Sequence, residues 1–138
     1  MKTKIIFILG VIGLLISCQQ TTSTTATDVP KIKKGMIKVT ILYPNGDGKT
    51  FDMDYYSDKH MPMIAGLLGD SLKLFEIDKG LAGRTPDEPV PFLAIGYLYF
   101  DNLSAFQNSF GPNAEKIRGD VPSYTNIQPV VQISEILR

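Results

Sequence analysis

His60 is the only histidine of the chain, and its side chain is the one best suited to proton transfer near neutral pH. Tyr56 precedes it by four positions, so both side chains would share one face of a helix. Pro62 follows inside the same helical pattern, where it removes a backbone donor. This spacing predicts an acid–base pair, in which Tyr56 hydrogen-bonds His60 or polarises a substrate oxygen. The competing interpretation is a buried histidine satisfied by a carbonyl group, with Tyr56 as core filler.

The apolar residues around this pair predict a ligand pocket inside the protomer, between a helix and a sheet. Its expected wall consists of helix and strand residues: Phe51, Met53, Met63, Ile64, Tyr97 and Tyr99. Arg84 lies on a long loop beside Asp87 and Glu88 and is a further candidate, because it could close over an anionic ligand. Solvated loop charges are the alternative for Arg84. The pocket would bind a small, largely hydrophobic molecule.

Metal and nucleotide sites are not expected. One histidine without a carboxylate cluster at ligand spacing gives no zinc or iron site. Haem is not expected either, although His60 is a conceivable axial ligand, and we predict no cofactor. The Gly46-Asp47-Gly48 run belongs to a turn and fits no nucleotide fingerprint. Basic and acidic residues balance at 14 each, so nucleic acid is not an expected partner.

Residues 1–17 have the pattern of an export signal. Lys2 and Lys4 precede an apolar run from Ile5 to Ile16, which is shorter than the roughly 20 residues of a membrane-spanning helix. The run ends in Leu15-Ile16-Ser17-Cys18, which resembles the lipobox of bacterial lipoproteins and contains the only cysteine. The resemblance implies cleavage before Cys18 and acylation of that residue. An ordinary signal peptide or a buried free thiol is the alternative.

Residues 18–34 are polar and predict a flexible tether between the acylated cysteine and a folded domain. The protein would then be lipid-anchored in the bacterial cell envelope. Gln19, rather than aspartate, follows the cysteine, which by analogy with lipoprotein sorting favours the outer membrane. The periplasmic face of that membrane is the expected location.

Residues 35–138 predict one small domain. Alternating patterns predict strands over Met36–Tyr43, Ser71–Lys79 and Ile127–Leu137, and a continuous apolar run predicts a central strand over Phe92–Phe100. Three- and four-residue spacing predicts a helix over Phe51–Leu68 and a second from Asp101 or Asn102, interrupted at Gly111-Pro112. The order βαββαβ is that of an α+β, ferredoxin-like fold, an antiparallel sheet with two helices on one face.

The strand over Phe92–Phe100 is apolar on both faces, although the helices would cover only one. A second copy of the chain would cover the other face. We therefore expect a homodimer, a dimeric α/β barrel that buries roughly 1,200 Å2 or more.

The domain resembles the EthD family over Met36–Leu137. The resemblance is carried by Ile37–Pro44, Phe51–Tyr56 with His60-Met61-Pro62, Lys79–Gly83, Ala94–Phe100, Phe110-Gly111-Pro112 and Tyr124–Pro129. It implies a dimeric α/β barrel and an "EthD family reductase" or oxidoreductase, active in or accessory to a degradation pathway. The alternative is a non-catalytic, lipid-anchored binding or structural dimer module of the cell envelope.

Overall fold

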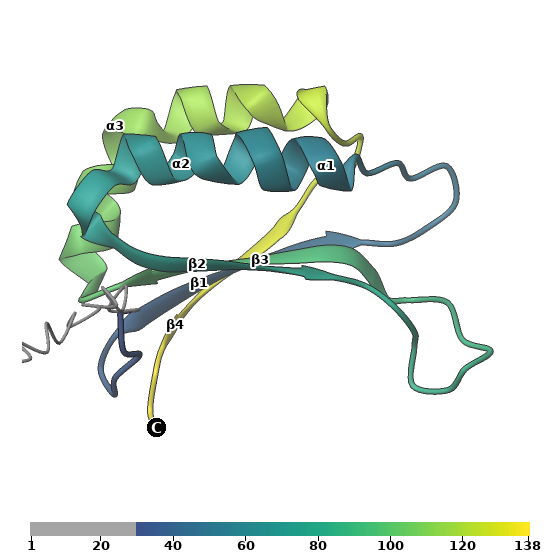
Figure 1. Cartoon of the computed structure of the whole chain (residues 1–138), viewed down its shortest axis with the longest axis horizontal. Coiled ribbons are helices and arrows are strands. Elements are labelled where there is room, and N and C mark those ends of the chain that lie inside the picture. Colours follow the sequence, from purple (N-terminus) through teal and green to yellow (C-terminus); the bar gives the residue numbers. More distant parts are fainter. Residues whose placement is uncertain (1–29) are drawn as a thin grey trace, which may run out of the picture.

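The computed structural model describes residues 30–138. The predicted signal over residues 1–17, Cys18 and most of the tether lie outside the described residues. The described chain contains one four-stranded antiparallel sheet, formed by β1 (Ile37–Pro44), β2 (Leu72–Lys79), β3 (Phe92–Phe100) and β4 (Val130–Glu135). Its strand order is β2-β3-β1-β4, so β4 is an edge strand (Figure 1).

The helices form a second layer over one face of this sheet (Figure 1). The first helical stretch consists of α1 (Met53–Tyr55), the π-helical segment η1 (Tyr56–His60) and α2 (Met61–Leu68). A 3-10 turn, η2 (Gly69–Ser71), follows it. The second stretch is α3 (Leu103–Asp120), followed by the 3-10 turn η3 (Val121–Ser123). This arrangement confirms the predicted α+β, ferredoxin-like fold.

Both helical stretches begin at side-chain caps. The carboxylate of Asp52 accepts a hydrogen bond from the backbone N–H of Tyr55, and the side chain of Asn102 accepts one from Ala105. Such caps satisfy backbone donors that have no partner inside the helix. The first helix therefore begins two residues later than the predicted Phe51.

Two other sequence-based boundaries were wrong. The helix α3 is continuous through Pro112 to Asp120, instead of being interrupted at Gly111-Pro112. Pro112 and Asn108 are both exposed, so the Asn108 carbonyl that loses its helical donor can bind water. The last strand begins at Val130 rather than Ile127, because the N–H of Ile127 bonds the Thr125 hydroxyl and Pro129 has no N–H to donate.

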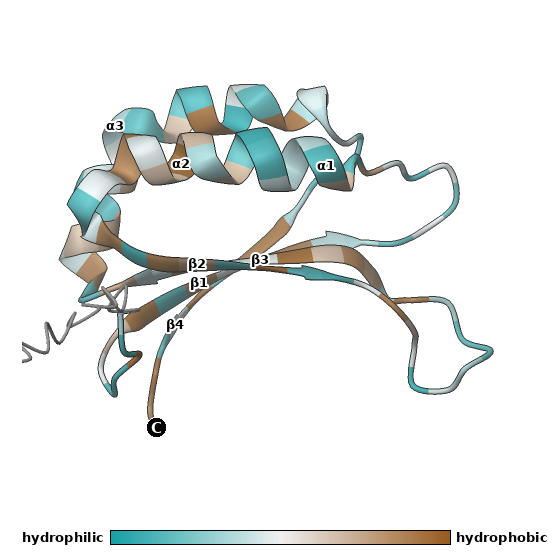
Figure 2. Cartoon of the chain, in the orientation of Figure 1, coloured by the Kyte–Doolittle hydropathy of each residue, from teal (hydrophilic) through white to brown (hydrophobic). Residues whose placement is uncertain are grey.

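The core lies between the helices and the sheet. Alternate residues of the central strands point into it, together with Tyr56 and the inner sides of α2 and α3: Ile37, Val39, Tyr43, Ala94, Leu98, Phe100, Ile64, Leu68 and Ile117. Figure 2 shows hydrophobic residues concentrated along the strands and hydrophilic ones on the outer sides of the helices. Burial of one such large side chain contributes roughly 1.5–3 kcal/mol.

The other face of the sheet carries a row of tyrosine–carboxylate pairs. The hydroxyl of Tyr97 donates to Oδ2 of Asp78 at 2.9 Å, and that of Tyr99 donates to Oε2 of Glu76 at 2.6 Å. Ile95 belongs to the same face, because it pairs directly with Asp78 across the β2–β3 ladder. A second copy packed on this face stays a prediction.

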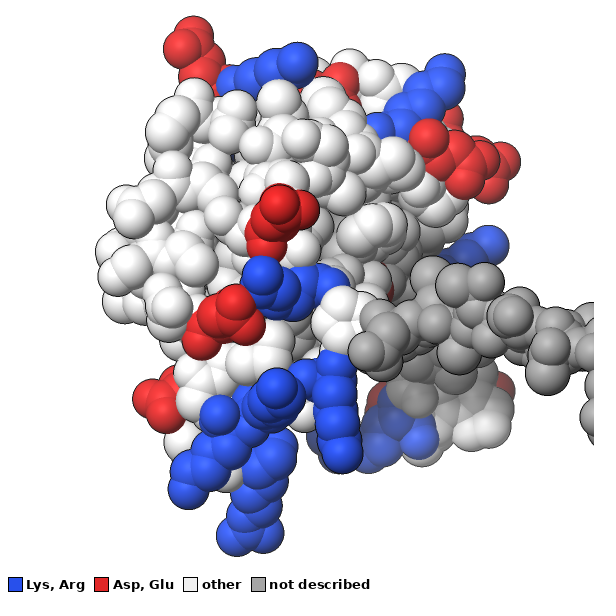
Figure 3. Space-filling model, turned by 60° about the vertical axis from the view of Figure 1, so that its left-hand side comes forward, with Lys and Arg blue, Asp and Glu red and all other residues white. Residues whose placement is uncertain are grey.

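Charged side chains lie mainly on the surface. Figure 3 shows several Lys and Arg side chains gathered at one end of the molecule and acidic side chains scattered over the same view. The half-buried Lys73 and the exposed Asp101 form an ion pair at 3.3 Å, and surface pairs of this kind contribute at most about 1 kcal/mol. Among residues 30–138, no helix has the length and apolar character needed to cross a membrane.

Candidate active site

His60 is held at both ring nitrogens. Nδ1 lies 2.7 Å from Oδ2 of Asp120, and Nε2 lies 3.2 Å from the hydroxyl of Tyr124. The side chain is 3% exposed. The residue therefore sits in a fixed position at the inner side of the helix layer, not at the surface.

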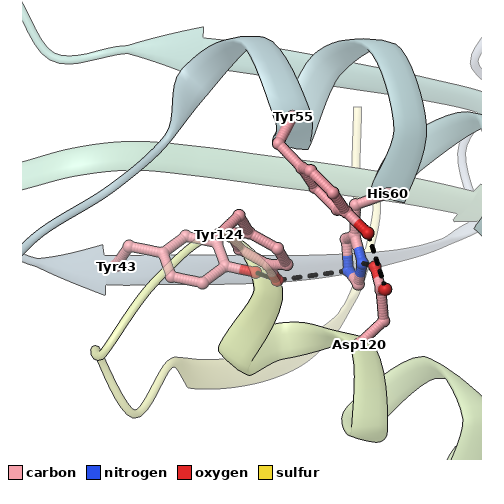
Figure 4. A network of polar contacts seen from close by, with 5 residues as sticks. All are labelled: Tyr43, Tyr55, His60, Asp120 and Tyr124. Atoms are coloured by element: carbon pink, nitrogen blue, oxygen red, sulfur yellow. Dashed lines mark hydrogen bonds and ion pairs between the residues drawn. The ribbon is translucent and has the colours of Figure 1, made fainter.

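Two more tyrosines extend these contacts. The hydroxyl of Tyr55 donates to Oδ1 of Asp120 at 3.0 Å, and the hydroxyls of Tyr43 and Tyr124 lie 2.8 Å apart. We call these five residues, Tyr43, Tyr55, His60, Asp120 and Tyr124, the histidine network. Figure 4 shows their side chains converging from the first helix, from β1 and from the end of α3 with the segment after it.

The π-helical segment brings His60 and Tyr56 to the core together. The N–H of Met61 bonds the carbonyl of Tyr56, five residues back, and this wider turn places both side chains inward. Their rings stack at a centroid distance of 5.6 Å and an interplanar angle of 22°. Single π-turns inside helices are frequent at functional sites.

Burial and hydrogen bonding shift the pKa values of His60 and Asp120. Burial lowers the pKa of His60 below its ordinary value, although the hydrogen bond to Asp120 and that residue's charge oppose the shift. Burial raises the pKa of Asp120, but hydrogen bonds from His60 and Tyr55 outweigh it, so the pKa of that carboxyl is lowered. Near neutral pH the pair is therefore an imidazole beside a carboxylate.

These charge states fix the direction of the hydrogen bonds. The Asp120 carboxylate can only accept, so Nδ1 of His60 carries the proton, and Nε2 accepts the bond from the Tyr124 hydroxyl. The Tyr124 oxygen then accepts from Tyr43. Burial raises the pKa of both tyrosines, which keeps the two hydroxyls protonated. The lone pair that could act as a base is that of Nε2.

A cavity of about 730 Å3 lies beside this network, between α3, β1 and β4. His60 and Tyr43 contribute to its wall. Most of the lining is apolar and includes Val39, Ile41, Leu98, Phe106, Phe110 and Ile117. A largely apolar cavity of this size with few polar groups is typical of sites for small molecules.

The predicted hydrogen bond between Tyr56 and His60 is wrong. Tyr56 is fully buried, but its hydroxyl has no hydrogen-bond partner among the described residues. The hydroxyl points at Gly96 of β3, where a side chain would collide with it. Tyr56 therefore positions the ring of His60 by stacking and takes no part in the polar network.

Tyr97 and Tyr99 were also placed wrongly by the prediction. They alternate along β3 with Leu98 and Phe100, whose side chains are in the core, so both tyrosines point to the opposite face of the sheet. They cannot line the same pocket as His60. Of the predicted wall residues, the structure brings Ile64 to the cavity.

The remaining predicted residues lie elsewhere. Phe51 packs edge-on against Tyr43 and Tyr56, and Met53 and Met63 pack on the core without lining the cavity. Arg84 is exposed on the loop between β2 and β3, where its backbone N–H donates to Oε2 of Glu88 at 3.0 Å. The prediction that it closes over the pocket has no support in these contacts.

Sequence reasoning missed Asp120 and did not propose Tyr124 as a site residue. Both follow His60 by at least 60 positions, and nothing in the local pattern pairs them with it. A carboxylate at the end of a helix, next to a proline-containing turn and a tyrosine, was the available signal. For metal ions, residues 30–138 bring no three His, Cys, Asp or Glu side chains together. The prediction of no cofactor stays a prediction.

The fold and site thus define a ferredoxin-like α+β protein with a histidine network beside an apolar cavity. A model of the EthD domain matches residues 48–127, more than half of the chain, and the chain belongs to the EthD family. An EthD-like protein from Ralstonia eutropha JMP134 has 40% identity and a TM-score of 0.71, over 75% of this chain and 93% of that one.

Two more distant structures share the fold. An ethyl tert-butyl ether d (EthD) family protein from Bacillus halodurans C-125 has 17% identity and a TM-score of 0.53, over 74% of this chain and 99% of that one. A hydroxynitrile lyase from Passiflora edulis has 15% identity and a TM-score of 0.53, over 75% of this chain and 95% of that one. A search of curated proteins gave no match.

Proposed function

We propose that this EthD-domain protein binds a small, largely apolar molecule in the 730 Å3 cavity and that His60 exchanges a proton with it. The observation that carries the proposal is the position of His60, which lines the cavity while Asp120 holds its Nδ1 at 2.7 Å. Asp120 acts as a positioning residue, because it fixes the tautomer and stabilises the imidazolium that forms when Nε2 takes up a proton. A positioned acid–base group contributes roughly 10²–10⁴-fold to a rate.

The Tyr124 hydroxyl occupies the side of the imidazole from which the proton would come. A substrate proton reaches Nε2 either after Tyr124 rotates away or through its hydroxyl, which can donate to His60 while accepting from the substrate. The proton donor of the substrate would be a carbon next to a carbonyl group, or a hydroxyl. The oxidoreductase activity that the family resemblance implies needs an electron acceptor and stays a separate prediction.

The fold itself is compatible with catalysis. The Passiflora edulis protein of the same fold is named as a lyase, although the similarity extends to the fold alone. Family membership supports an EthD-domain function without specifying a reaction. The proposal therefore depends on the geometry at His60.

Deuterium exchange tests the proton transfer directly. Apolar ketones and aldehydes are incubated with the protein in D2O, and exchange of the protons next to the carbonyl is followed by NMR. His60→Gln should reduce the exchange rate at least 100-fold, on the order of a general-base contribution. Asp58→Asn is the matched control, since Asp58 is exposed in the same π-helical segment and should leave the rate unchanged. Equal rates in the wild type and His60→Gln would refute the proposal.

A non-catalytic binding or structural module is the second candidate. The observation in its favour is that Nε2 of His60 already has a partner in Tyr124, so the network is satisfied without a ligand. In that case ligands bind His60→Gln nearly as well as the wild type, and no compound exchanges protons in either protein. In both cases we propose a lipid-anchored protein of the bacterial cell envelope, with Cys18 as the acylated residue.

A further inference from the structure

We propose that Arg118 makes the cavity selective for amphipathic monoanions, small molecules with an apolar body and one carboxylate or similar group. This inference rests on the proposed ligand binding in the same cavity and names the class of ligand. Its starting point is that Arg118 is the only Lys, Arg, Asp or Glu among the described residues that line the cavity. One cation at an otherwise uncharged, apolar site favours an anion of single charge.

The position of Arg118 is set by α3. Gln107, Gly111 and Arg118 follow one another at intervals of four and seven residues, which places them on one side of the helix, and all three line the cavity. Gln107 and Arg118 are exposed, whereas Phe106 and Phe110 beside them are half-buried. The polar side chains therefore form the rim of the cavity and the aromatic ones its wall.

The guanidinium of Arg118 lies against that aromatic wall. Its central carbon is 5.9 Å from the ring centroid of Phe110, within the range of a cation–π contact. Such a contact restricts the long side chain at the rim without consuming its five N–H donors. The fork of donors stays available for a carboxylate, which arginine binds with two parallel hydrogen bonds.

No carboxylate of the described chain neutralises this cation. Ion pairs within residues 30–138 join His60 to Asp120 and Lys73 to Asp101, and none involves Arg118. Asp120, two positions after Arg118, is engaged by His60 and Tyr55. The positive charge at the rim therefore has no counter-ion among residues 30–138.

A bound monoanion would lie with its charged group at the rim and its apolar body inside. Gln128 lines the cavity from the segment before β4, and its side-chain amide can donate to a remaining lone pair of the anion, as can that of Gln107. The apolar body would contact Phe106, Phe110 and Ile117, and its far end would lie next to His60. The proton exchanged by His60 would then belong to a part of the ligand remote from its acid group.

Three probes of equal chain length and different charge test the selectivity: octanoate, 1-octanol and octylammonium. Binding to the purified full chain is measured by titration calorimetry. Octanoate should bind about tenfold more tightly than 1-octanol, as expected for a charge-assisted hydrogen bond, and octylammonium should bind most weakly. In 15N-labelled protein, octanoate should shift the backbone amide signals of Phe110 and Gln128.

Arg118→Met keeps the apolar stem and removes the charge. It should bring octanoate and octanol within twofold of each other. Lys116→Met is the matched control, because Lys116 is an exposed cation of the same helix that does not line the cavity, and it should preserve the preference. Equal binding of octanoate and octanol by the wild type, or an undiminished preference in Arg118→Met, would overturn the proposal.

The experiments distinguish failure of the anion site from failure of proton transfer. The octanoate preference requires no turnover and should persist in His60→Gln. If Arg118→Met abolishes the preference while no compound exchanges protons, the anion site stands and proton transfer fails. If His60-dependent exchange occurs but Arg118→Met changes neither binding nor exchange, proton transfer stands and the anion site fails.

Discussion

Nδ1 of His60 and Oδ2 of Asp120 lie 2.7 Å apart although 60 positions separate the two residues. This contact joins the π-helical segment of the first helix to the end of α3. Tyr55 and Tyr124 bond the same pair, so two helical stretches meet at one buried polar cluster. Buried networks of this kind depend strongly on the protonation state of each member.

Acidification should destabilise the protein as His60 becomes protonated. The pKa of His60 is lowered in the folded state by burial, so the unfolded chain binds the proton more readily, with a pKa near 6.5. The stabilisation from neutral His60 is present above pH 6.5 and is lost as the pH falls from 6.5 toward the folded-state pKa. Urea unfolding at intervals between pH 7.5 and 5 should show a falling free energy of unfolding.

His60→Gln is the control for this window, because the chain contains no other histidine. The variant should show a flatter dependence of the unfolding free energy between pH 6.5 and 5. A second loss, due to Asp120, belongs below pH 3.8, because the pKa of that carboxyl is lowered in the folded state. An equal slope between pH 6.5 and 5 in the wild type and His60→Gln would contradict the assignment.

Gly96→Ala should destabilise the protein through a collision with Tyr56. The new Cβ would meet the Tyr56 hydroxyl, and both residues lie in the packed core. Overpacking of this kind costs roughly 1–3 kcal/mol. Tyr56→Phe alone should be neutral or stabilise by about 1 kcal/mol, because it removes a buried hydroxyl that lacks a partner. Thermal and urea unfolding measure both effects.

The double variant separates the collision from other effects of alanine. Without the hydroxyl, the next ring atom of residue 56 is 3.4 Å from the new Cβ, so Tyr56→Phe should rescue most of the loss caused by Gly96→Ala. Gly119→Ala is the control, since its Cβ meets nothing within 4 Å and alanine favours a helix by about 1 kcal/mol. Additive effects of Tyr56→Phe and Gly96→Ala would exclude the proposed contact.

Periodicity was enough to predict the fold, because strand and helix faces are local properties of the chain. The continuous apolar run over Phe92–Phe100 identified β3, and the spacing around His60 identified the inner face of the first helix. The pattern could not show the π-turn over Tyr56–His60, since adding one residue to a turn leaves both side chains on the buried face. Nor could it show that Pro112 stays inside α3, which depends on exposure of the Asn108 carbonyl.

The site was predictable only in part, because its contacts are long-range. His60 stood out by its chemistry, but its partners Asp120 and Tyr124 come from the end of α3 and the turn after it. Tyr97 and Tyr99 were assigned to the pocket for their aromatic character, yet the alternation of β3 already places them opposite Leu98. Strict use of that alternation would have avoided this error.

Cys18 should carry the lipid anchor. Growth of a bacterial host with a clickable palmitate analogue should label the wild-type chain, and mass spectrometry should locate the label on an N-terminal Cys18. Cys18→Ala removes the only thiol and should abolish both the labelling and the recovery of the protein in the membrane fraction. Retention of the variant in that fraction would argue against acylation as the anchor.

The outer face of the sheet should hold a second copy of the chain. Ile95 lies at the middle of this face, opposite Leu42 of β1 and Asp78 of β2, and is half-buried in the protomer. Analytical ultracentrifugation should show a dimer, and Ile95→Glu should weaken it at least tenfold by placing a charge in the interface. Leu81→Glu, at a position that is 89% exposed, should leave it unchanged. A monomeric wild type would contradict the barrel prediction.

Tyr124→Phe distinguishes a catalytic network from a structural one. The variant removes the hydroxyl that bonds both His60 and Tyr43, and it should cost roughly 1–3 kcal/mol because two buried polar groups lose a partner.

The same variant leaves the lone pair of Nε2 of His60 without the Tyr124 hydroxyl, so that Nε2 can accept a substrate proton directly. If His60 transfers protons, deuterium exchange of bound ketones should persist or accelerate in this variant despite its lower stability. If the hydroxyl itself relays the proton, exchange should fall with little change in ligand binding. Loss of stability in a protein that never exchanges protons would assign the network to structure alone.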